Sequence, residues 1–430
     1  MFLLEDKKIK ILLVSITVVV LSPTFFNDFQ LEWDDNWMLL ENPFVRNFSW
    51  NHIWYHFLHF YKGQYSPVNT VLYGMVYSVF GFNPVVYHFF CLLLHLLSAL
   101  CVYQFVKECV RKIKPNYELY RVNIYAGVVA LFFGIHPLQV ESVAWISASK
   151  VVLFGFFTMF GLLMYIKFIL ERKWWMYGCV VLVYLLAFGS KEQAIIFPLL
   201  LLVVDWLFGR CKSNDDTCIW HNLWLIVEKM PFFVLALGMW YFSLQHNLGG
   251  IEMLNTYPFD QRLFFGCHSL VQYIFRFLAP IKLNYFYCYP IEVGDVIPFY
   301  YWIYPLLVLI IFLFTWYNYK QKNQLVVFGV LFFLINLLLV LHIIPMPRKM
   351  ITADRYIYLS VIGISLVLVC LLDDLFHRFS KQQKWIIVSM VLFFIVIGSH
   401  SFFRTNQWKN SNTIKQNRII KEASIKQRML

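Results

Sequence analysis

Long apolar segments recur along this whole chain, and they limit what it can fold into. Most are about 18 to 22 residues long, the length of helix that crosses the hydrocarbon core of a bilayer. Of the 430 residues, 60% are hydrophobic and only 14% are charged, whereas a soluble domain keeps roughly a quarter of its residues charged. The pattern excludes a disordered chain and an ordinary soluble enzyme, and it predicts an all-α polytopic membrane protein.

We expect about eleven membrane crossings, one for each apolar run. The runs lie at residues 9–26, 84–106, 122–138, 150–170, 174–189, 193–208, 223–244, 299–318, 325–344, 356–373 and 384–403. The first run lacks the small-residue cleavage site of a signal peptide, so we interpret it as an uncleaved span. Two further stretches, 67–81 and 263–279, are ambiguous. The first is short and begins with Pro67, which favours an interfacial helix.

Basic residues between the runs assign the two sides of the membrane. The net charge of +12 indicates orientation, because cytoplasmic loops are enriched in Lys and Arg. If 67–81 and 263–279 do not cross, all the basic clusters lie on one side, which we assign to the cytoplasm. The first loop, 27–83, and the basic tail, 404–430, are then external. The clusters contain Lys7, Lys8 and Lys10; Lys107, Arg111, Lys112, Lys114 and Arg121; Lys167, Arg172 and Lys173; Arg210 and Lys212; Lys320 and Lys322; and Arg378, Lys381 and Lys384.

A crossing at 263–279 would move every later segment to the other side of the membrane. We prefer the non-crossing arrangement, because the orientation rule applies better to short loops than to tails.

Two adjacent carboxylates, Asp34 and Asp35, lie in the first loop just beyond the first span. Adjacent acids repel each other and partial desolvation raises a carboxylate pKa, so such a pair can supply a general base or hold a cation. A solvated acidic loop is the alternative. The sequence contains no Gly-rich phosphate loop, no HExxH motif and no Cys/His spacing typical of zinc.

Several basic residues break the orientation rule, because they fall at the external ends of spans. They are Lys150, Lys191, Arg348, Lys349 and Arg355. An anionic ligand at the membrane surface would account for them, and snorkelling toward lipid headgroups is the alternative. With the acidic loop, they indicate a pocket in which a lipid-linked phosphate faces a general base. The forked guanidinium of Arg355 suits a phosphate, and Asp354 beside it could orient it.

His136 lies at the end of the run at 122–138, where Pro137 interrupts the helix. This places the imidazole at the external end of a span, where it could hydrogen-bond a phosphate or an acceptor. A histidine that only caps the broken helix is the alternative.

Four sequence blocks follow one another between residue 33 and about residue 365. They are Trp33-Asp34-Asp35 through Leu40-Glu41-Asn42-Pro43; His136-Pro137 through Glu141-Ser142-Val143-Ala144-Trp145-Ile146; Ser190-Lys191 through Pro198 with Asp205-Trp206; and Ala353-Asp354-Arg355-Tyr356 through Leu359. In this order they resemble the membrane half of the proteins with transmembrane and tetratricopeptide repeats. That family belongs to the glycosyltransferase C (GT-C) superfamily, together with the protein O-mannosyltransferases.

The resemblance implies a GT-C-like transmembrane domain over residues 1–403, with interfacial helices in the first loop. It further implies an inverting transfer of sugar from a polyprenyl-phosphate donor to an acceptor hydroxyl on the extracytoplasmic side. Asp34 and Asp35 match the family's catalytic acids, with Asp34 as the base. The donor phosphate would be bound by Lys150, Lys191, Arg355 and His136, with Glu141, Asp354 and Arg348 in supporting positions.

The chain departs from the family at Ser149-Lys150-Val151, where relatives usually have Arg-Lys-Asp, and at Ser190-Lys191-Glu192, where they often have Ser-Lys-Pro. We expect no repeat domain after the tail at 404–430. A lipid-linked-sugar transporter and a glycan ligase or polymerase remain alternatives.

The expected partners are a polyprenyl-phosphate sugar, an acceptor protein or glycan and the bilayer, without nucleic acid. A divalent cation could bridge Asp35 and the phosphate, but two acids are too few ligands to assign a metal. Richness in Lys, Ile, Phe and Asn favours a bacterial inner membrane with the site facing the periplasm. The endoplasmic reticulum is the alternative.

Overall fold

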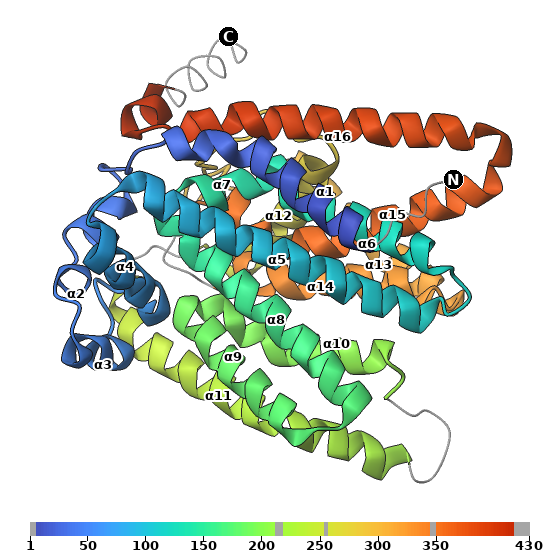
Figure 1. Ribbon diagram of the computed structural model, residues 1–430, viewed down its shortest axis with the longest axis horizontal. Helices are drawn as coiled ribbons and strands as arrows, with labels where there is room; N and C mark the ends of the chain where they lie inside the picture. The colour runs from blue at the N-terminus through green and yellow to red at the C-terminus, as the bar shows by residue number, and fades with distance from the viewer. Residues whose placement is uncertain (1–5, 211–217, 253–256, 345–349, 417–430) are drawn as a thin grey trace.

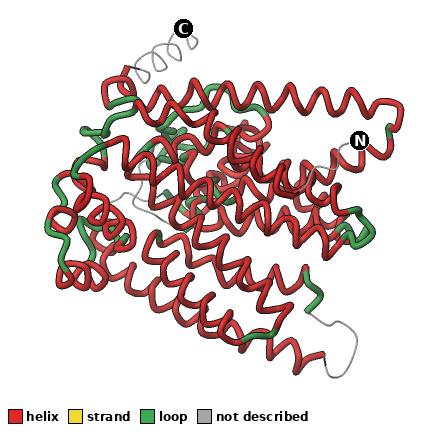
Figure 2. The backbone as a smooth tube through the Cα atoms, in the orientation of Figure 1, coloured by secondary structure: helices red, strands yellow, loops and turns green. Residues whose placement is uncertain are grey.

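The protein is a bundle of helices joined by loops of varied length (Figures 1 and 2). The computed structural model describes residues 6–210, 218–252, 257–344 and 350–416. Within these ranges β pairing is limited to isolated bridges, so the all-α prediction is confirmed. The α-helices are α1 (Asp6–Leu21), α2 (Pro43–Arg46), α3 (Trp50–Leu58), α4 (Pro67–Phe80), α5 (Pro84–Ile113), α6 (Leu119–Ile135), α7 (Val140–Ala144), α8 (Ser149–Glu171), α9 (Trp174–Ser190), α10 (Phe197–Leu207), α11 (Cys218–Glu252), α12 (Phe259–Leu278), α13 (Ile303–Lys320), α14 (Gln324–Leu337), α15 (Ser360–Arg378) and α16 (Gln383–Thr405).

Seven helical segments in the described ranges are long and apolar enough to cross a membrane. They are Asp6–Phe26, Pro84–Ile113, Ile146–Glu171, Leu223–Phe242, Phe299–Lys320, Ser360–Arg378 and Ser380–Trp408. A bent pair, Leu119–Ile135 with Pro137–Ala144, is an eighth candidate. Each predicted apolar run coincides with a helix, and the chain is a multi-pass integral membrane protein. The count of about eleven crossings is not confirmed, because helices such as α9, α10 and α14 are shorter than a full span.

The bend between α6 and α7 follows directly from the sequence. Pro137 has no amide hydrogen and restricts the residue before it to extended backbone, and His136 has φ −66° and ψ 138°. The helix axis turns by 49° at this break. The short helix α7 thereby lies across one end of the bundle, where it carries Glu141.

The two ends of the bundle are distinct, and we call the one that carries the first loop the loop end. Figure 1 shows α2, α3 and α4 gathered there, on the side of the bundle where α16 also ends. Helix α12 lies along this end, because Arg262 near its start donates to the Ile343 carbonyl at 2.8 Å and Arg276 near its finish donates to the Thr352 hydroxyl at 2.9 Å. These contacts support the arrangement in which residues 263–279 do not cross.

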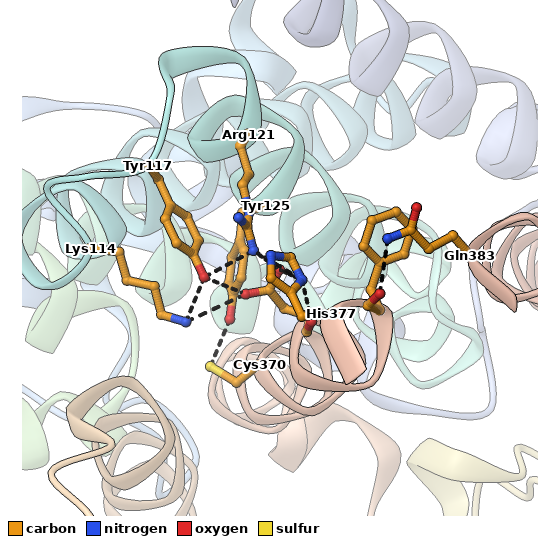
Figure 3. A network of polar contacts seen from close by, with 9 residues as sticks. Lys114, Tyr117, Arg121, Tyr125, Cys370, His377 and Gln383 are labelled. Atoms are coloured by element: carbon orange, nitrogen blue, oxygen red, sulfur yellow. Dashed lines mark hydrogen bonds and ion pairs between the residues drawn. The ribbon is translucent and has the colours of Figure 1, made fainter. Parts of the chain in front are cut away.

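Basic residues that the sequence assigned to the cytoplasm gather at the opposite end. Figure 3 shows Lys114, Tyr117 and Arg121, from the end of α5 and the start of α6, around the end of α15. Asp373 accepts hydrogen bonds from Arg121 at 2.6 Å and from Tyr117 at 2.7 Å. This network joins the α5–α6 turn to α15 at the end farthest from the first loop.

A second ionic network at the opposite end ties α8, α10 and α11 together. Asp205 accepts hydrogen bonds from Tyr165 at 2.7 Å and from Arg210 at 2.9 Å, and it pairs with Lys229. Glu228 pairs with Arg210 at 2.7 Å. The two acids and two bases balance in charge, as buried ions require.

Candidate functional site

Asp35 anchors the first loop to the start of the third candidate span. It is fully buried. One carboxylate oxygen accepts from the Ser147 amide at 2.8 Å and from the Ser147 hydroxyl, and the other accepts from the Gln30 amide at 2.8 Å. Burial raises the pKa of Asp35 to about 6, although the hydrogen bonds from Ser147 and Gln30 oppose the rise. Both oxygens of Asp35 are therefore used inside the protein.

Asp34, its neighbour, has a different environment. Its side chain is partly exposed, and one oxygen accepts a hydrogen bond from the Trp37 indole nitrogen at 3.1 Å. The adjacent acids are therefore separated by structure into a buried anchor and an accessible carboxylate, and Asp34 is the one that can meet a ligand.

Arg355 lies in a short 3-10 helix, Asp354–Ile357, and its guanidinium feels the negative charge of Asp34. Its guanidinium forms an ion pair with Glu141, which is fully buried in α7, and its backbone amide donates to Glu141 at 3.2 Å. Burial acts to lower the pKa of Arg355, but the Glu141 carboxylate and, more weakly, Asp34 raise it above its ordinary value. The guanidinium also lies over the Trp145 ring at 5.3 Å.

The sequence suggested that Asp354 orients Arg355, but in the structure Asp354 has other partners. It is fully buried and pairs instead with Arg404 at 2.5 Å, while Tyr287 donates to its other oxygen at 3.0 Å. Because consecutive residues of a helical turn point in different directions, Asp354 is directed toward α16 and Arg355 toward Glu141.

The two lysines also lie at the loop end. Lys191 is buried, and its ammonium lies 5.6 Å from the centre of the Tyr356 ring, the same ring that Arg355 approaches at 5.1 Å. Lys150 lies against the first loop, with its ammonium 3.9 Å from the Met38 sulfur. The structure thus brings Asp34 and the cations of three separate segments to one end of the bundle.

Two further predicted cations, Arg348 and Lys349, lie outside the described residues.

His136 is occupied by the backbone on both ring nitrogens. Nδ1 accepts from the Leu138 amide at 3.2 Å, which leaves Nε2 to donate to the Phe277 carbonyl at 3.0 Å. The ring also stacks on Phe277 at 4.8 Å. This geometry matches the capping role that the sequence left open, and we leave His136 out of the proposed phosphate site.

Residues 404–415 form what we call the C-terminal strap, which lies against the first loop. Side chains and amides of four loop residues between positions 27 and 32 contact the strap. The contacts are Asn27 to the Thr405 carbonyl at 3.2 Å, Asp28 to the Lys409 carbonyl at 2.8 Å, Gln30 to the Trp408 carbonyl at 2.6 Å, Glu32 to the Ser411 hydroxyl at 3.2 Å, and the Glu32–Lys415 ion pair. Gln30 therefore contacts the buried acid Asp35 through its amide and the strap through its side chain.

Aromatic rings connect the strap to the charged residues. Trp408 stacks on Trp145 at 5.7 Å, and Trp33 packs edge-on against Trp145 at 5.9 Å and against Tyr285 at 5.1 Å. Because the Arg355 guanidinium also lies over Trp145, the strap contacts the loop that holds Asp34 and is linked to Arg355 through the Trp145 ring. The sequence alone does not reveal this role, since the residues after the last span show only the pattern of a basic tail.

The described residues contain no group of three His, Cys, Asp or Glu side chains suited to a metal ion. The proposed cation bridge through Asp35 has no support from the geometry, because Ser147 and Gln30 already occupy that carboxylate.

One curated relative resembles most of this chain. A Caenorhabditis elegans protein named as a protein O-mannosyl-transferase is 21% identical over 361 residues, which is 80% of this chain. The match covers 47% of that protein, so the chain spans about half the length of its relative. No protein-family model matches, and no solved structure matches.

The relative is eukaryotic, so it gives no support to the predicted bacterial inner membrane, whereas the endoplasmic reticulum alternative is compatible with it.

Proposed function

We propose that this protein is a membrane glycosyltransferase that moves a sugar from a polyprenyl-phosphate donor to an acceptor hydroxyl. The proposal rests on the gathering at the loop end of the accessible carboxylate of Asp34 and of Arg355 and Lys191, which approach the same Tyr356 ring; the charge of Asp34 acts on Arg355. A base facing cations at a membrane surface suits transfer from a lipid-linked phosphate. The printed name of the relative agrees with this class of activity.

In the proposed reaction Asp34 removes the proton of the acceptor hydroxyl. The acceptor oxygen attacks the anomeric carbon, the bond from that carbon to the phosphate oxygen breaks, and polyprenyl phosphate leaves with the bonding electrons. Attack opposite the leaving group inverts the anomeric configuration. Arg355, Lys191 and Lys150 stabilise the negative charge that grows on the phosphate, as preorganised cations do in a site of low dielectric.

The supporting residues hold these groups in place. Glu141 fixes the guanidinium of Arg355 and offsets part of its charge, so the arginine binds a phosphate without forming a strong pair with Asp34. Asp35 fixes the loop through Ser147 and Gln30. Displacement of reacting groups by about 1 Å can cost on the order of a hundredfold in rate, so these contacts bear directly on turnover.

We assign residues 1–403 to one transmembrane domain and place its loop end on the extracytoplasmic side. The basic residues of the opposite end, including the network in Figure 3, support this orientation by the positive-inside rule. With a eukaryotic relative, the endoplasmic reticulum is the compartment we propose, with the site facing the lumen.

The proposal is tested with purified protein in lipid nanodiscs, radiolabelled polyprenyl-phosphate mannose and a mixture of hydroxyl-bearing peptides and glycans. We expect label in the acceptor fraction, release of one polyprenyl phosphate per sugar, and inverted anomeric configuration. Label that crosses the bilayer of a proteoliposome without leaving its lipid would contradict the proposal and favour a transporter. Label joined to another lipid-linked glycan would indicate a polymerase.

A further inference from the structure

A groove at the opposite end of the bundle is separate from the candidate site. It consists of two adjoining cavities on the α13–α14 pair. One, of about 440 Å³, is lined by Trp206, Tyr319, Lys320, Lys322, Gln324 and Val327. The other, of about 220 Å³, is lined by Phe312, Thr315, Trp316, Tyr319 and Val327. Because both cavities share Tyr319 and Val327, they adjoin each other, and we refer to the pair as the groove.

The two halves of the groove differ in chemistry. The larger half holds two cations, Lys320 and Lys322, with Gln324 and no carboxylate among its lining residues. The smaller half is lined by aromatic and aliphatic side chains apart from Thr315. The Thr315 hydroxyl donates a hydrogen bond to the Ile311 carbonyl at 2.7 Å. A ligand that fits both halves must carry a negative charge at one end and an apolar chain at the other.

The position of the groove exposes it to the membrane. Of the seven candidate spans in the described residues, Phe299–Lys320 is the least buried, with only 6% of its most apolar segment inside the protein. Phe312, Trp316 and Tyr319 recur at helical spacing and are each more than half exposed. The apolar half therefore opens to hydrocarbon, and the lysines at the end of the span lie at headgroup depth.

The turn that carries the lysines is fixed by the structure. Asn318 is buried and donates to the Phe314 carbonyl at 2.9 Å, and it accepts from Asn323 at 2.9 Å. Lys322 has φ +59°, a left-handed backbone conformation that residues other than glycine rarely adopt. The Lys320 ammonium lies 4.8 Å from the centre of the Trp316 ring. Local contacts thus fix the turn that places both lysines at the mouth of the groove, and Lys320 also lies against Trp316.

Charge complementarity identifies the occupant. Asp205, the neighbour of the lining residue Trp206, is paired with Arg210 and Lys229, so it is not available to neutralise the lysines of the groove. We propose that the groove binds an anionic phospholipid of the adjacent leaflet, with the phosphate between Lys320 and Lys322 and one acyl chain along Phe312 and Trp316. This inference does not depend on the proposed enzymatic function.

The test measures lipid binding to the full-length purified protein by native mass spectrometry, with phosphatidylglycerol and phosphatidylcholine as probes. We expect the wild type to prefer phosphatidylglycerol, and Lys320→Ala/Lys322→Ala to weaken its binding by about thirtyfold, since each cation near a membrane surface contributes to anionic-lipid attraction. The matched control Lys381→Ala/Lys384→Ala removes two exposed cations that lie outside the groove. It should leave phosphatidylglycerol binding within a factor of two.

A second variant tests the apolar half. Thr315→Trp fills the smaller cavity without changing charge, and we expect it to weaken phosphatidylglycerol binding while the melting temperature stays near that of the wild type. Inorganic phosphate at millimolar concentration should not compete. Equal losses from the two double-lysine variants, unchanged binding by Thr315→Trp, or competition by free phosphate would each overturn the proposed lipid site.

Discussion

The ion pair between Arg355 and Glu141 should contribute strongly to the stability of the folded protein. Glu141 is fully buried and the Arg355 side chain is 13% exposed. Replacing one member of a buried ion pair leaves the other charge without compensation, which costs about 3 to 5 kcal/mol. Removing both charges avoids that cost. The pair therefore predicts strong non-additivity in the free energy of unfolding.

The perturbation is a double-mutant cycle of Arg355→Gln and Glu141→Gln. We expect Arg355→Gln to destabilise the protein by about 3 to 5 kcal/mol, because it strands the buried carboxylate. Glu141→Gln should cost less, because the Arg355 side chain that it leaves behind is 13% exposed and the charge of Asp34 still favours the charged guanidinium. The double variant should recover roughly half of the summed loss.

The assay is chemical unfolding in detergent, followed by tryptophan fluorescence. The control cycle uses the exposed pair Lys173 and Glu171, whose side chains are 57% and 43% exposed, and its coupling should be at most about 1 kcal/mol. Additive losses at Arg355 and Glu141, or coupling no larger than in the control, would refute the assignment of Glu141 as the partner that holds Arg355.

Three further predictions concern the anchors of the site. Trp408→Ala should lower the rate of sugar transfer by about tenfold with donor affinity nearly unchanged, because the strap aligns the loop with Arg355. Trp408→Phe should keep most of the wild-type rate. Trp385→Ala, at an exposed tryptophan of α16, should have no effect. Folding raises the pKa of Asp35 from 3.8 to about 6. The folded state is therefore stabilised by about 3 kcal/mol below about pH 4, where Asp35 is protonated, and this contribution is lost as the pH rises through 6. Unfolding of Asp35→Asn should lack that decline between pH 4 and 6, and an identical pH profile would exclude the assignment. His136→Ala should lower the melting temperature while donor affinity stays within a factor of two, whereas a selective loss of donor binding would return His136 to the phosphate site.

Sequence patterns predicted where the helices lie, because hydrophobic runs of membrane length depend on local composition. They did not predict how many helices span, because the lengths of α9, α10 and α14 are fixed by the turns that end them. The break at Pro137 was predictable from its missing amide.

The candidate site was predictable only in part. Counting crossings placed Asp34, Lys191 and Arg355 at the same end, and the structure brings them together there. The pairing of Arg355 with Glu141 depends on contacts between residues 214 positions apart, so no local pattern carried it. The same holds for the strap, where Gln30 meets a backbone carbonyl 378 positions away.

The central claim is that Asp34 accepts the proton of the acceptor hydroxyl. Its most direct test is the single-turnover rate of sugar transfer by Asp34→Asn beside Glu41→Gln, which neutralises another acid of the same loop. We predict a loss of at least about a hundredfold for Asp34→Asn, with unchanged affinity for the polyprenyl-phosphate donor, and a normal rate for Glu41→Gln. Transfer by Asp34→Asn at the wild-type rate would contradict the account.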